Sequence, residues 1–292
     1  MRLPAFSGPI HSRIAPTPSG YLHTGNAFSF LLTWLLVRAG GGTLFLRIDD
    51  MDAARKRPQY LEDIFRTLEW LGITYDSGPS GPDDFEKNYS QVHRSPIYVK
   101  LIDDLTETGI VFACSCTRTQ GTSPLKLPHQ CKCRTANLPW QGHALRAFVP
   151  EEARIEIEPG REVLLGREQG SFVVRRRDGL PAYQLTSIAD DLHFGIDAVV
   201  RGEDLTASTA MQIHLLTALG RKTPVFFHHP LLLDSSGKKL SKSTDSPAIA
   251  EYRAGGGTTE SLLRAFCSWA GLPVRDSLKD ILAQMRVTSK KT

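Results

Sequence analysis

The sequence predicts an α/β fold: a β–α–β unit with further strands and helices, interrupted by a small insertion and followed by a short helical extension. Three observations support this prediction. Residues 13–49 contain, in order, a short strand, a Pro/Gly turn, a helix and a second strand. Residues 110–179 change to a cysteine-bearing segment of short strands, and strand–helix alternation resumes from Pro181. Helices that alternate with strands are typical of a parallel sheet with helices on its faces.

Size and composition are those of an ordinary globular protein. The chain has 292 residues, of which 41% are hydrophobic and 23% charged. Its net charge of +4 permits a nucleic-acid partner but does not require one. The first 12 residues lack the apolar core of a secretion signal, and the longest apolar stretch, 27–37, is too short to cross a bilayer. We therefore expect a cytoplasmic protein without membrane contact.

The first β–α–β unit has the features of an anion site. A Pro/Gly turn after Arg13 leads into a helix from about Gly25 to Ala39, and Thr43 to Asp49 returns as a strand. The free N–H groups of a helix N-terminus attract anions, and His23 at this point can add a donor to a phosphate. The alternative interpretation is a tight connection with no ligand.

A second candidate phosphate site lies near the C-terminal end. The Gly/Ser loop from Asp234 to Ser243 carries Lys238, Lys239 and Lys242. Three lysines suit a triphosphate, because a flexible point charge can follow a leaving group. The alternative is a solvated loop with surface lysines.

The remaining segments follow recognisable patterns. A helix should begin at Pro58 and end at Gly72, and an apolar stripe supports it. Further helices are expected over 90–108 and 205–219, a loop over 76–87, strands over 196–201 and 224–233, and two helices with a basic tail after Pro247.

Four of the five cysteines fall in the insertion, as two Cys-x-Cys pairs: Cys114 with Cys116, and Cys131 with Cys133. Four thiolates can surround a tetrahedral zinc ion. In a cytoplasmic protein, metal is favoured over disulfides. A regulatory redox cluster and an unmetallated remnant are the alternatives.

Short strands fill the rest of the insertion, over 144–149, 155–158, 162–165 and 171–177. Three consecutive arginines, 175–177, could contact phosphate. Because side chains alternate along a strand, a solvated surface is an equally good interpretation.

The two phosphate sites together resemble the signatures of a known family. His23-Thr24-Gly25-Asn26 and Lys239-Leu240-Ser241-Lys242-Ser243 are similar to the HIGH and KMSKS motifs of class I aminoacyl-tRNA synthetases. Further motifs over 13–20, 46–52, 89–94 and 200–205 resemble the glutamyl branch. Residues 10–245 align with that family in order. Only 49 residues follow Ser243, so the chain resembles the truncated glutamyl-Q tRNA(Asp) synthetases, which lack an anticodon-binding domain.

This resemblance implies a Rossmann-type class I synthetase fold in four parts: 1–109 and 180–245 as the two halves of the catalytic domain, 110–179 as a zinc-binding and acceptor-binding insertion, and 246–292 as the helical extension. It implies activation of glutamate by ATP and transfer to queuosine in tRNA(Asp). The implied glutamate site comprises Arg13, Ala15, Thr17, Asp49, Tyr183 and Arg201. The implied ATP site comprises His23, Gly25, Asn26, Lys239, Leu240, Ser241, Lys242 and Ser243, with His23 and Lys242 catalytic. Mg²⁺ and Zn²⁺ are the implied metals, and a monomer is expected.

The chain departs from the family pattern at three places. Asp49 replaces a glutamate, which shortens the acid by one methylene, and Asn26 ends the first signature. In the family the zinc ligands are Cys-x-Cys, a tyrosine and a Cys-Arg pair, which would make Cys131 a bystander. Chemistry prefers four sulfurs, so Cys114, Cys116, Cys131 and Cys133 are the predicted ligands, with His129 as the alternate for Cys131. An adenylate-forming enzyme with another acceptor and a non-catalytic binding paralogue stay as alternatives.

Overall fold

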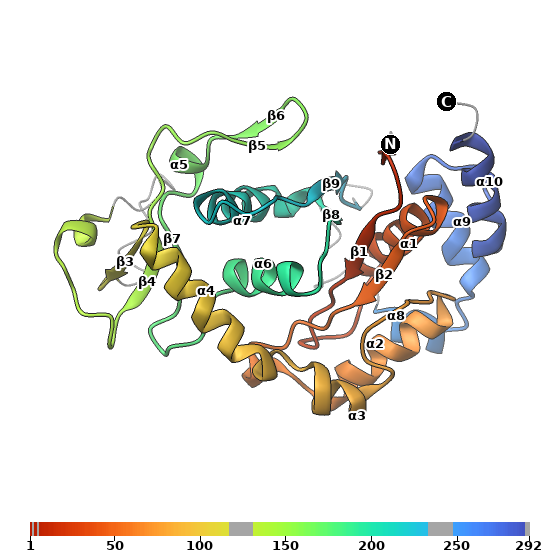
Figure 1. Ribbon diagram of the computed structural model, residues 1–292. Coiled ribbons are helices and arrows are strands. Elements are labelled where there is room, and N and C mark those ends of the chain that lie inside the picture. Colours follow the sequence, from red (N-terminus) through yellow and green to blue (C-terminus); the bar gives the residue numbers. More distant parts are fainter. Residues whose placement is uncertain (2, 5, 117–130, 233–247, 290–292) are drawn as a thin grey trace. The chain divides into compact units, whose positions relative to one another are not determined.

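The computed structural model describes the chain except residues 2, 5, 117–130, 233–247 and 290–292 (Figure 1). The chain forms two compact units. The first comprises 1–93, 197–203 and 227–292, and the second 94–196 and 204–226. The KLSKS loop and His129 lie outside the described residues. The predicted α/β class is confirmed, and the four-part domain division stays a prediction.

A parallel strand pair forms the centre of the first unit. Strand β1 (His11–Ile14) pairs with β2 (Thr43–Leu46), with Arg13 opposite Phe45. Helix α1 (Thr24–Ala39) connects them and is buried along most of its length. Gly42 is required at the return turn, because a Cβ there would lie 2.1 Å from the Ile10 carbonyl oxygen. The predicted strand–turn–helix–strand unit is therefore confirmed.

A third strand lies next to β1. Strand β8 (Ala198–Gly202) begins beside it, where the His11 amide donates to Asp197 Oδ1 at 2.8 Å and the Asp197 amide donates to the His11 carbonyl at 3.0 Å. Strand β9 (Val225–His229) pairs with β8. The order of these strands in space differs from their order in the chain, which is typical of an open α/β sheet.

Helices complete the first unit. The predicted helix from Pro58 is α2 (Pro58–Trp70). The C-terminal region contains three helices, α8 (Ile249–Ala254), α9 (Thr259–Ala270) and α10 (Leu278–Ser289), so the prediction of two helices was wrong. The break arises because Gly256 has a positive φ of 85° and the Thr258 side chain caps α9. Among the described residues, none of the helices has the length and hydrophobicity needed to span a bilayer.

The expected loop over 76–87 is partly helical. It contains α3 (Pro82–Asp84) and a π-helical turn, η2 (Phe85–Tyr89). Asp84 explains the difference, since its carboxylate accepts from the Ser80 amide at 2.8 Å and from Asn88 Nδ2 at 2.8 Å. Short 3₁₀ turns occur at Ala53–Arg55 (η1), Gln91–Arg94 (η3), Lys132–Thr135 (η5) and Glu203–Leu205 (η6).

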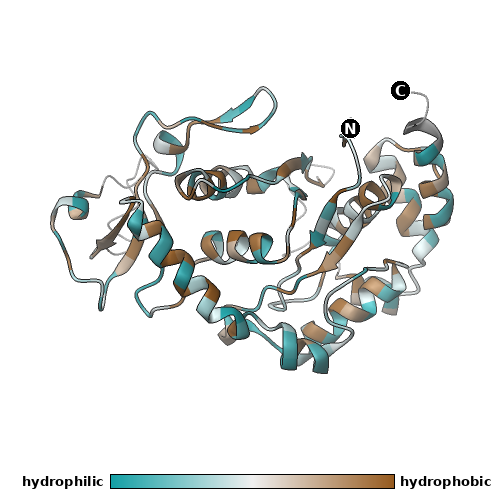
Figure 2. Ribbon diagram, viewed as in Figure 1, coloured by the Kyte–Doolittle hydropathy of each residue, from teal (hydrophilic) through white to brown (hydrophobic). Residues whose placement is uncertain are grey.

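The second unit packs three helices with a small sheet (Figure 1). The helices are α4 (Ser95–Glu107), α6 (Tyr183–His193) and α7 (Thr206–Ala218), and the last two carry bands of hydrophobic and hydrophilic residues (Figure 2). The antiparallel sheet has the order β3 (Val111–Cys114), β4 (Ala144–Ala147), β7 (Phe172–Arg175). A hairpin, β5 (Ile155–Glu158) with β6 (Arg161–Val163), and the short α5 (Leu165–Glu168) complete the unit.

A buried ion pair holds α6 to the start of α4. Asp190 is fully buried and accepts from Arg94 Nε at 2.7 Å and Nη2 at 3.0 Å. The Tyr98 hydroxyl donates to the same carboxylate at 2.8 Å, and burial beside Asp190 raises the pKa of Tyr98. Because a buried carboxylate is costly without hydrogen-bond donors, this network stabilises the orientation of α6.

Candidate active site

A pocket of about 220 Å³ lies at the N-terminus of α1. Its walls come from the turn after β1 and the first turns of the helix: Ala15, Pro16, Thr17, Ser19, Gly20, Tyr21, Leu22, His23, Asn26 and Phe30. The positive end of the α1 dipole is located here, so the pocket combines concave shape with partial positive charge. Its size and polarity suit part of a nucleotide.

The residues of the first signature have distinct local roles. Asn26 Oδ1 accepts a hydrogen bond from the His23 amide at 3.1 Å and so caps α1. A Cβ on Gly25 would lie 3.1 Å from Cε1 of the His23 ring, so a side chain at this position would crowd the imidazole. Asn26, which differs from the family signature, therefore has a structural reason to be present.

The acid predicted to meet the α-ammonium is held by a neighbour. Asp49 Oδ1 accepts from Arg47 Nε at 2.7 Å and Oδ2 from Nη2 at 3.1 Å, and both side chains are buried. The Asp49 amide donates to the Pro16 carbonyl at 2.9 Å, which extends the β1–β2 pairing to the wall of the pocket. This bidentate pair fixes the direction of the shorter carboxylate.

The next residue, Asp50, anchors the same segment. It accepts from Ser90 Oγ at 2.6 Å, from the Gln91 amide at 2.8 Å and from Lys56 Nζ at 3.1 Å. Partial burial opposes protonation of Lys56, but hydrogen bonds to Glu86 and Asp50 raise its pKa, so it stays cationic. Asp49 and Asp50 therefore have separate partners.

The predicted glutamate ligands divide between the two units. Arg13 on β1 and Arg201 on β8 are both buried in the first unit, which also contains Ala15, Thr17 and Asp49. Tyr183 begins α6 in the second unit and is 44% exposed there. The lysine loop, with Lys239, Leu240, Ser241, Lys242 and Ser243, is outside the described residues.

The four cysteines of the insertion lie together in the second unit. Their sulfur atoms are all within 4.8 Å of one another, and the Sγ–Sγ distances are 3.3 Å for Cys114–Cys131, 3.8 Å for Cys116–Cys131 and 3.7 Å for Cys116–Cys133. Sulfur atoms around a tetrahedral zinc ion stand about 3.8 Å apart. The donor set and its spacing fit zinc, and Cys131 lies inside the cluster.

Thiol ionisation differs within this cluster. Burial raises the pKa of Cys116 to about 11 and also raises that of Cys131. Burial opposes ionisation of Cys133 too, but hydrogen bonds from Ser115 and the neighbouring sulfurs lower its pKa to about 6. A thiolate at Cys133 gives an incoming cation its first anionic ligand.

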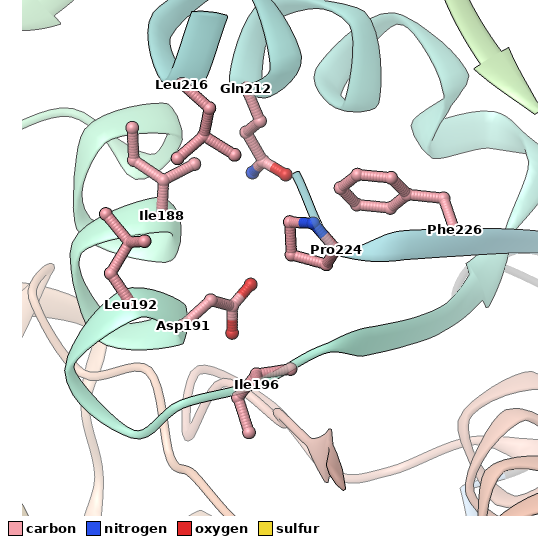
Figure 3. Close-up of a pocket in the computed structure, with 8 residues that line it drawn as sticks. All are labelled: Ile188, Asp191, Leu192, Ile196, Gln212, Leu216, Pro224 and Phe226. Atoms are coloured by element: carbon pink, nitrogen blue, oxygen red, sulfur yellow. The ribbon is translucent and has the colours of Figure 1, made fainter. Parts of the chain in front are cut away.

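A second cavity, between α6 and α7, is too small for a substrate (Figure 3). Its volume is about 10 Å³, and its walls are mainly apolar, with Asp191 and Gln212 as the polar groups. Such a space holds about one water molecule.

Sequence reasoning missed the partner of Asp49. Residues two apart on a strand point the same way, so Arg47 beside Asp49 was a readable signal. The Arg94–Asp190 pair had no such signal, because its members are 96 residues apart.

Comparison with known proteins agrees with these features. The family of tRNA synthetases class I (E and Q), catalytic domain, matches residues 9–123 and 130–292. A glutamyl-Q tRNA(Asp) synthetase of Nitratidesulfovibrio vulgaris is 34% identical over 90% of this chain and 87% of its own length. A protein of the same name from Pseudomonas aeruginosa is 38% identical over 86% of this chain and 83% of its own length.

The fold also has solved counterparts. A glutamate-tRNA synthetase from Elizabethkingia anophelis superposes with a TM-score of 0.78 and 24% identity. The alignment covers 95% of this chain but 66% of that protein, so this chain spans about two thirds of its length. The matches over nearly the whole chain establish that it belongs to the class I aminoacyl-tRNA synthetases of the glutamyl and glutaminyl type, a family of ligases.

Proposed function

We propose that the chain activates glutamate with ATP, forming glutamyl-adenylate and pyrophosphate, and transfers the glutamyl group to queuosine at the wobble position of tRNA(Asp). The observation that carries this proposal is the pocket at the N-terminus of α1, formed by the first signature and joined to Asp49 through the Pro16 backbone. The names of the relatives support the acceptor.

Adenylation requires position and positive charge more than a covalent catalyst. A carboxylate oxygen of glutamate attacks the α-phosphorus, the bond to the bridging oxygen breaks, and pyrophosphate leaves with both electrons. The α1 amides and His23 would hold the phosphates, and Lys242 would stabilise charge on the leaving group. His23, Gly25, Asn26, Lys239, Leu240, Ser241, Lys242 and Ser243 are the proposed ATP site. Mg²⁺ would enter with the phosphates of ATP.

The protein should select its amino-acid substrate by the negative charge of the side chain. Arg13 and Arg201 are buried, and a carboxylate beside them would offset the cost of burying guanidinium groups. Glutamine would present a neutral amide where glutamate presents a charge, so weaker binding of glutamine is expected. Asp49 would govern the α-ammonium end, with Ala15 and Thr17 beside it. Tyr183 is proposed by resemblance to the family. Aspartate is the serious competitor, since it keeps the charge and is one methylene shorter.

The experiment is ATP–pyrophosphate exchange with glutamate, aspartate and glutamine at equal concentration. We expect the highest kcat/KM with glutamate, and a higher value for either rival would overturn the amino-acid assignment. Glutamyl transfer is then measured with queuosine-containing and queuosine-free tRNA(Asp). Transfer to the first only supports the acceptor. If pyrophosphate exchange occurs but glutamyl transfer is equal for the two tRNAs or absent from both, the acceptor is another molecule. If no amino acid supports exchange, the chain is a binding paralogue.

A further inference from the structure

The insertion contains an arginine held in place by an aromatic ring. The guanidinium carbon of Arg134 lies 3.6 Å from the centroid of the Phe148 ring, which is stacking distance. Phe148 is itself fixed, because its amide donates to the Ile110 carbonyl at 2.8 Å and its carbonyl accepts from His214 Nε2 at 2.8 Å. The Arg134 side chain therefore rests on a rigid support while the residue stays exposed.

Neighbouring arginines are engaged within the unit. Arg175 donates to the Trp140 carbonyl at 2.6 Å, Arg176 pairs with Asp178 at 2.6 Å, and Arg177 donates to the Ser115 carbonyl at 3.0 Å. Within the part of the chain that the structure describes, the Arg134 guanidinium makes its ring contact and no hydrogen bond or ion pair. No described residue therefore occupies its in-plane N–H donors, whereas Arg175, Arg176 and Arg177 each have one guanidinium nitrogen, Nη2, engaged within the unit.

The surrounding sequence favours a polyanion as that ligand. Residues 108–150 contain no aspartate or glutamate but carry five Lys or Arg: Arg118, Lys126, Lys132, Arg134 and Arg146. This segment has a net charge of +5 because it lacks acidic residues; its share of Lys and Arg, 5 of 43 residues, is close to that of the whole chain, 35 of 292. A segment without carboxylates does not repel nucleic-acid phosphates, so it can approach a polyanion.

The cysteine cluster sets the position of this arginine. Arg134 follows Cys133 directly on η5, and the Cys131 sulfur accepts from the Cys133 amide at 3.4 Å. A guanidinium that is already oriented loses less side-chain freedom when it binds a phosphate than a free one does. The backbone that carries Arg134 is therefore fixed by the same residues that would hold the metal.

We propose that Arg134, stacked on Phe148, contacts a backbone phosphate of the RNA acceptor. This inference rests on the proposed function, which supplies an RNA substrate, and adds the residue and the type of contact. A phosphate contact positions RNA without reading its sequence. It also releases counterions, so affinity depends on salt concentration.

The test is binding of the full-length, zinc-loaded protein to an unmodified tRNA(Asp) transcript and to queuosine-containing tRNA(Asp), at several salt concentrations. Arg134→Ala should weaken both complexes by roughly tenfold and reduce the slope of log K against log salt by about 0.7–0.9. Arg134→Lys should keep most of the slope because it keeps the charge. Phe148→Leu should give an intermediate loss of affinity.

Arg176→Ala is the matched control, since it removes an exposed arginine of the same unit that pairs with Asp178. It should bind like the wild type. Zinc content and the thermal midpoint of each variant show that the insertion is folded. Arg134→Ala binding within twofold of wild type, with an unchanged slope, would refute the proposal. Weaker binding with an unchanged slope would also refute it, because that pattern indicates contact with a base.

Pyrophosphate exchange separates this inference from the proposed function. Normal exchange in wild type and in Arg134→Ala, with the altered salt slope, supports both. A wild type without exchange would overturn the proposed function whatever Arg134 does. Normal exchange and transfer, together with tRNA binding that is insensitive to Arg134, would overturn only the phosphate contact.

Discussion

The backbones of His23 and Ala248 are paired in an antiparallel bridge, and the Ile249 amide donates to the Leu22 carbonyl at 2.7 Å. The chain that follows the lysine loop therefore joins the start of α1, where the first signature lies. Ser243 precedes Ala248 by five residues in the sequence. A substitution in one signature motif should consequently affect the backbone at the other motif.

Lys242→Ala should slow adenylate formation more than it weakens glutamate binding, because the charge of Lys242 is needed mainly in the transition state. Pyrophosphate-exchange kinetics would show kcat falling by more than tenfold with a smaller change in the KM for glutamate. Lys279→Ala on the exposed face of α10 is the control. A kcat within about threefold of wild type would make the KMSKS assignment wrong.

Asp49→Asn should both destabilise the first unit and impair glutamate use. It leaves Arg47 buried without its bidentate anion, and breaking a buried pair costs about 3–5 kcal/mol. Urea unfolding and exchange kinetics with varied glutamate and varied ATP measure the two effects. The KM for glutamate should rise more than the KM for ATP. Asp49→Glu is the companion variant, and higher activity with glutamate would show that the shorter acid is incompletely compensated.

Cys133→Ser should lower both metal content and the stability of the insertion. Purified without chelator, the wild type should contain about one zinc per chain, because four clustered sulfurs form a complete tetrahedral shell. Elemental analysis and thermal unfolding check this expectation. Cys267→Ser, which changes a buried cysteine on α9, should leave the zinc content unchanged. Metal-free wild type would contradict the zinc assignment.

Low pH should decrease the free energy of unfolding of the second unit, because His214 is buried there. Burial lowers the pKa of this imidazole below its ordinary value of 6.5, while its Nε2 donates to the Phe148 carbonyl. As pH falls below about 6.5, the unfolded chain takes up a proton that the folded chain resists, so stability decreases. Urea unfolding at pH 7.5 and 5.5 would measure the decrease in zinc-loaded protein. His214→Gln retains a donor without the titration, and an equal pH dependence in both proteins would argue against this role.

Local patterns in the sequence predicted local structure well. The helix from Pro58 was readable because its apolar stripe, its first proline and the final Gly72 agree. The helix over 183–193 was not identified, since its buried face includes Ser187, Asp190 and Asp191, which break the apolar periodicity. The burial of Asp190 depends on Arg94 and Tyr98, which are 96 and 92 residues away.

In the candidate site, too, local features were predictable from the sequence, whereas contacts between distant segments were not. The clustering of the cysteines follows from their spacing and chemistry, and the α1 pocket follows from the turn. The stacking of Arg134 on Phe148 required the fold of the insertion, because Arg134 lies on η5 and Phe148 follows β4. Sequence alone had offered the arginine run 175–177 as a phosphate contact, with a solvated surface as an equally good interpretation.

The position of β1 beside β8 delays the completion of this part of the fold during protein synthesis. The bond between His11 and Asp197 joins residues 186 positions apart. At about 5–20 residues per second, β1 must wait about 10–40 s for that neighbour to be synthesised. During this interval one edge of β1 stays open to pairing with other nascent chains. Slower translation or a scarcity of chaperones should therefore reduce the yield of this protein before it alters any property of the finished fold.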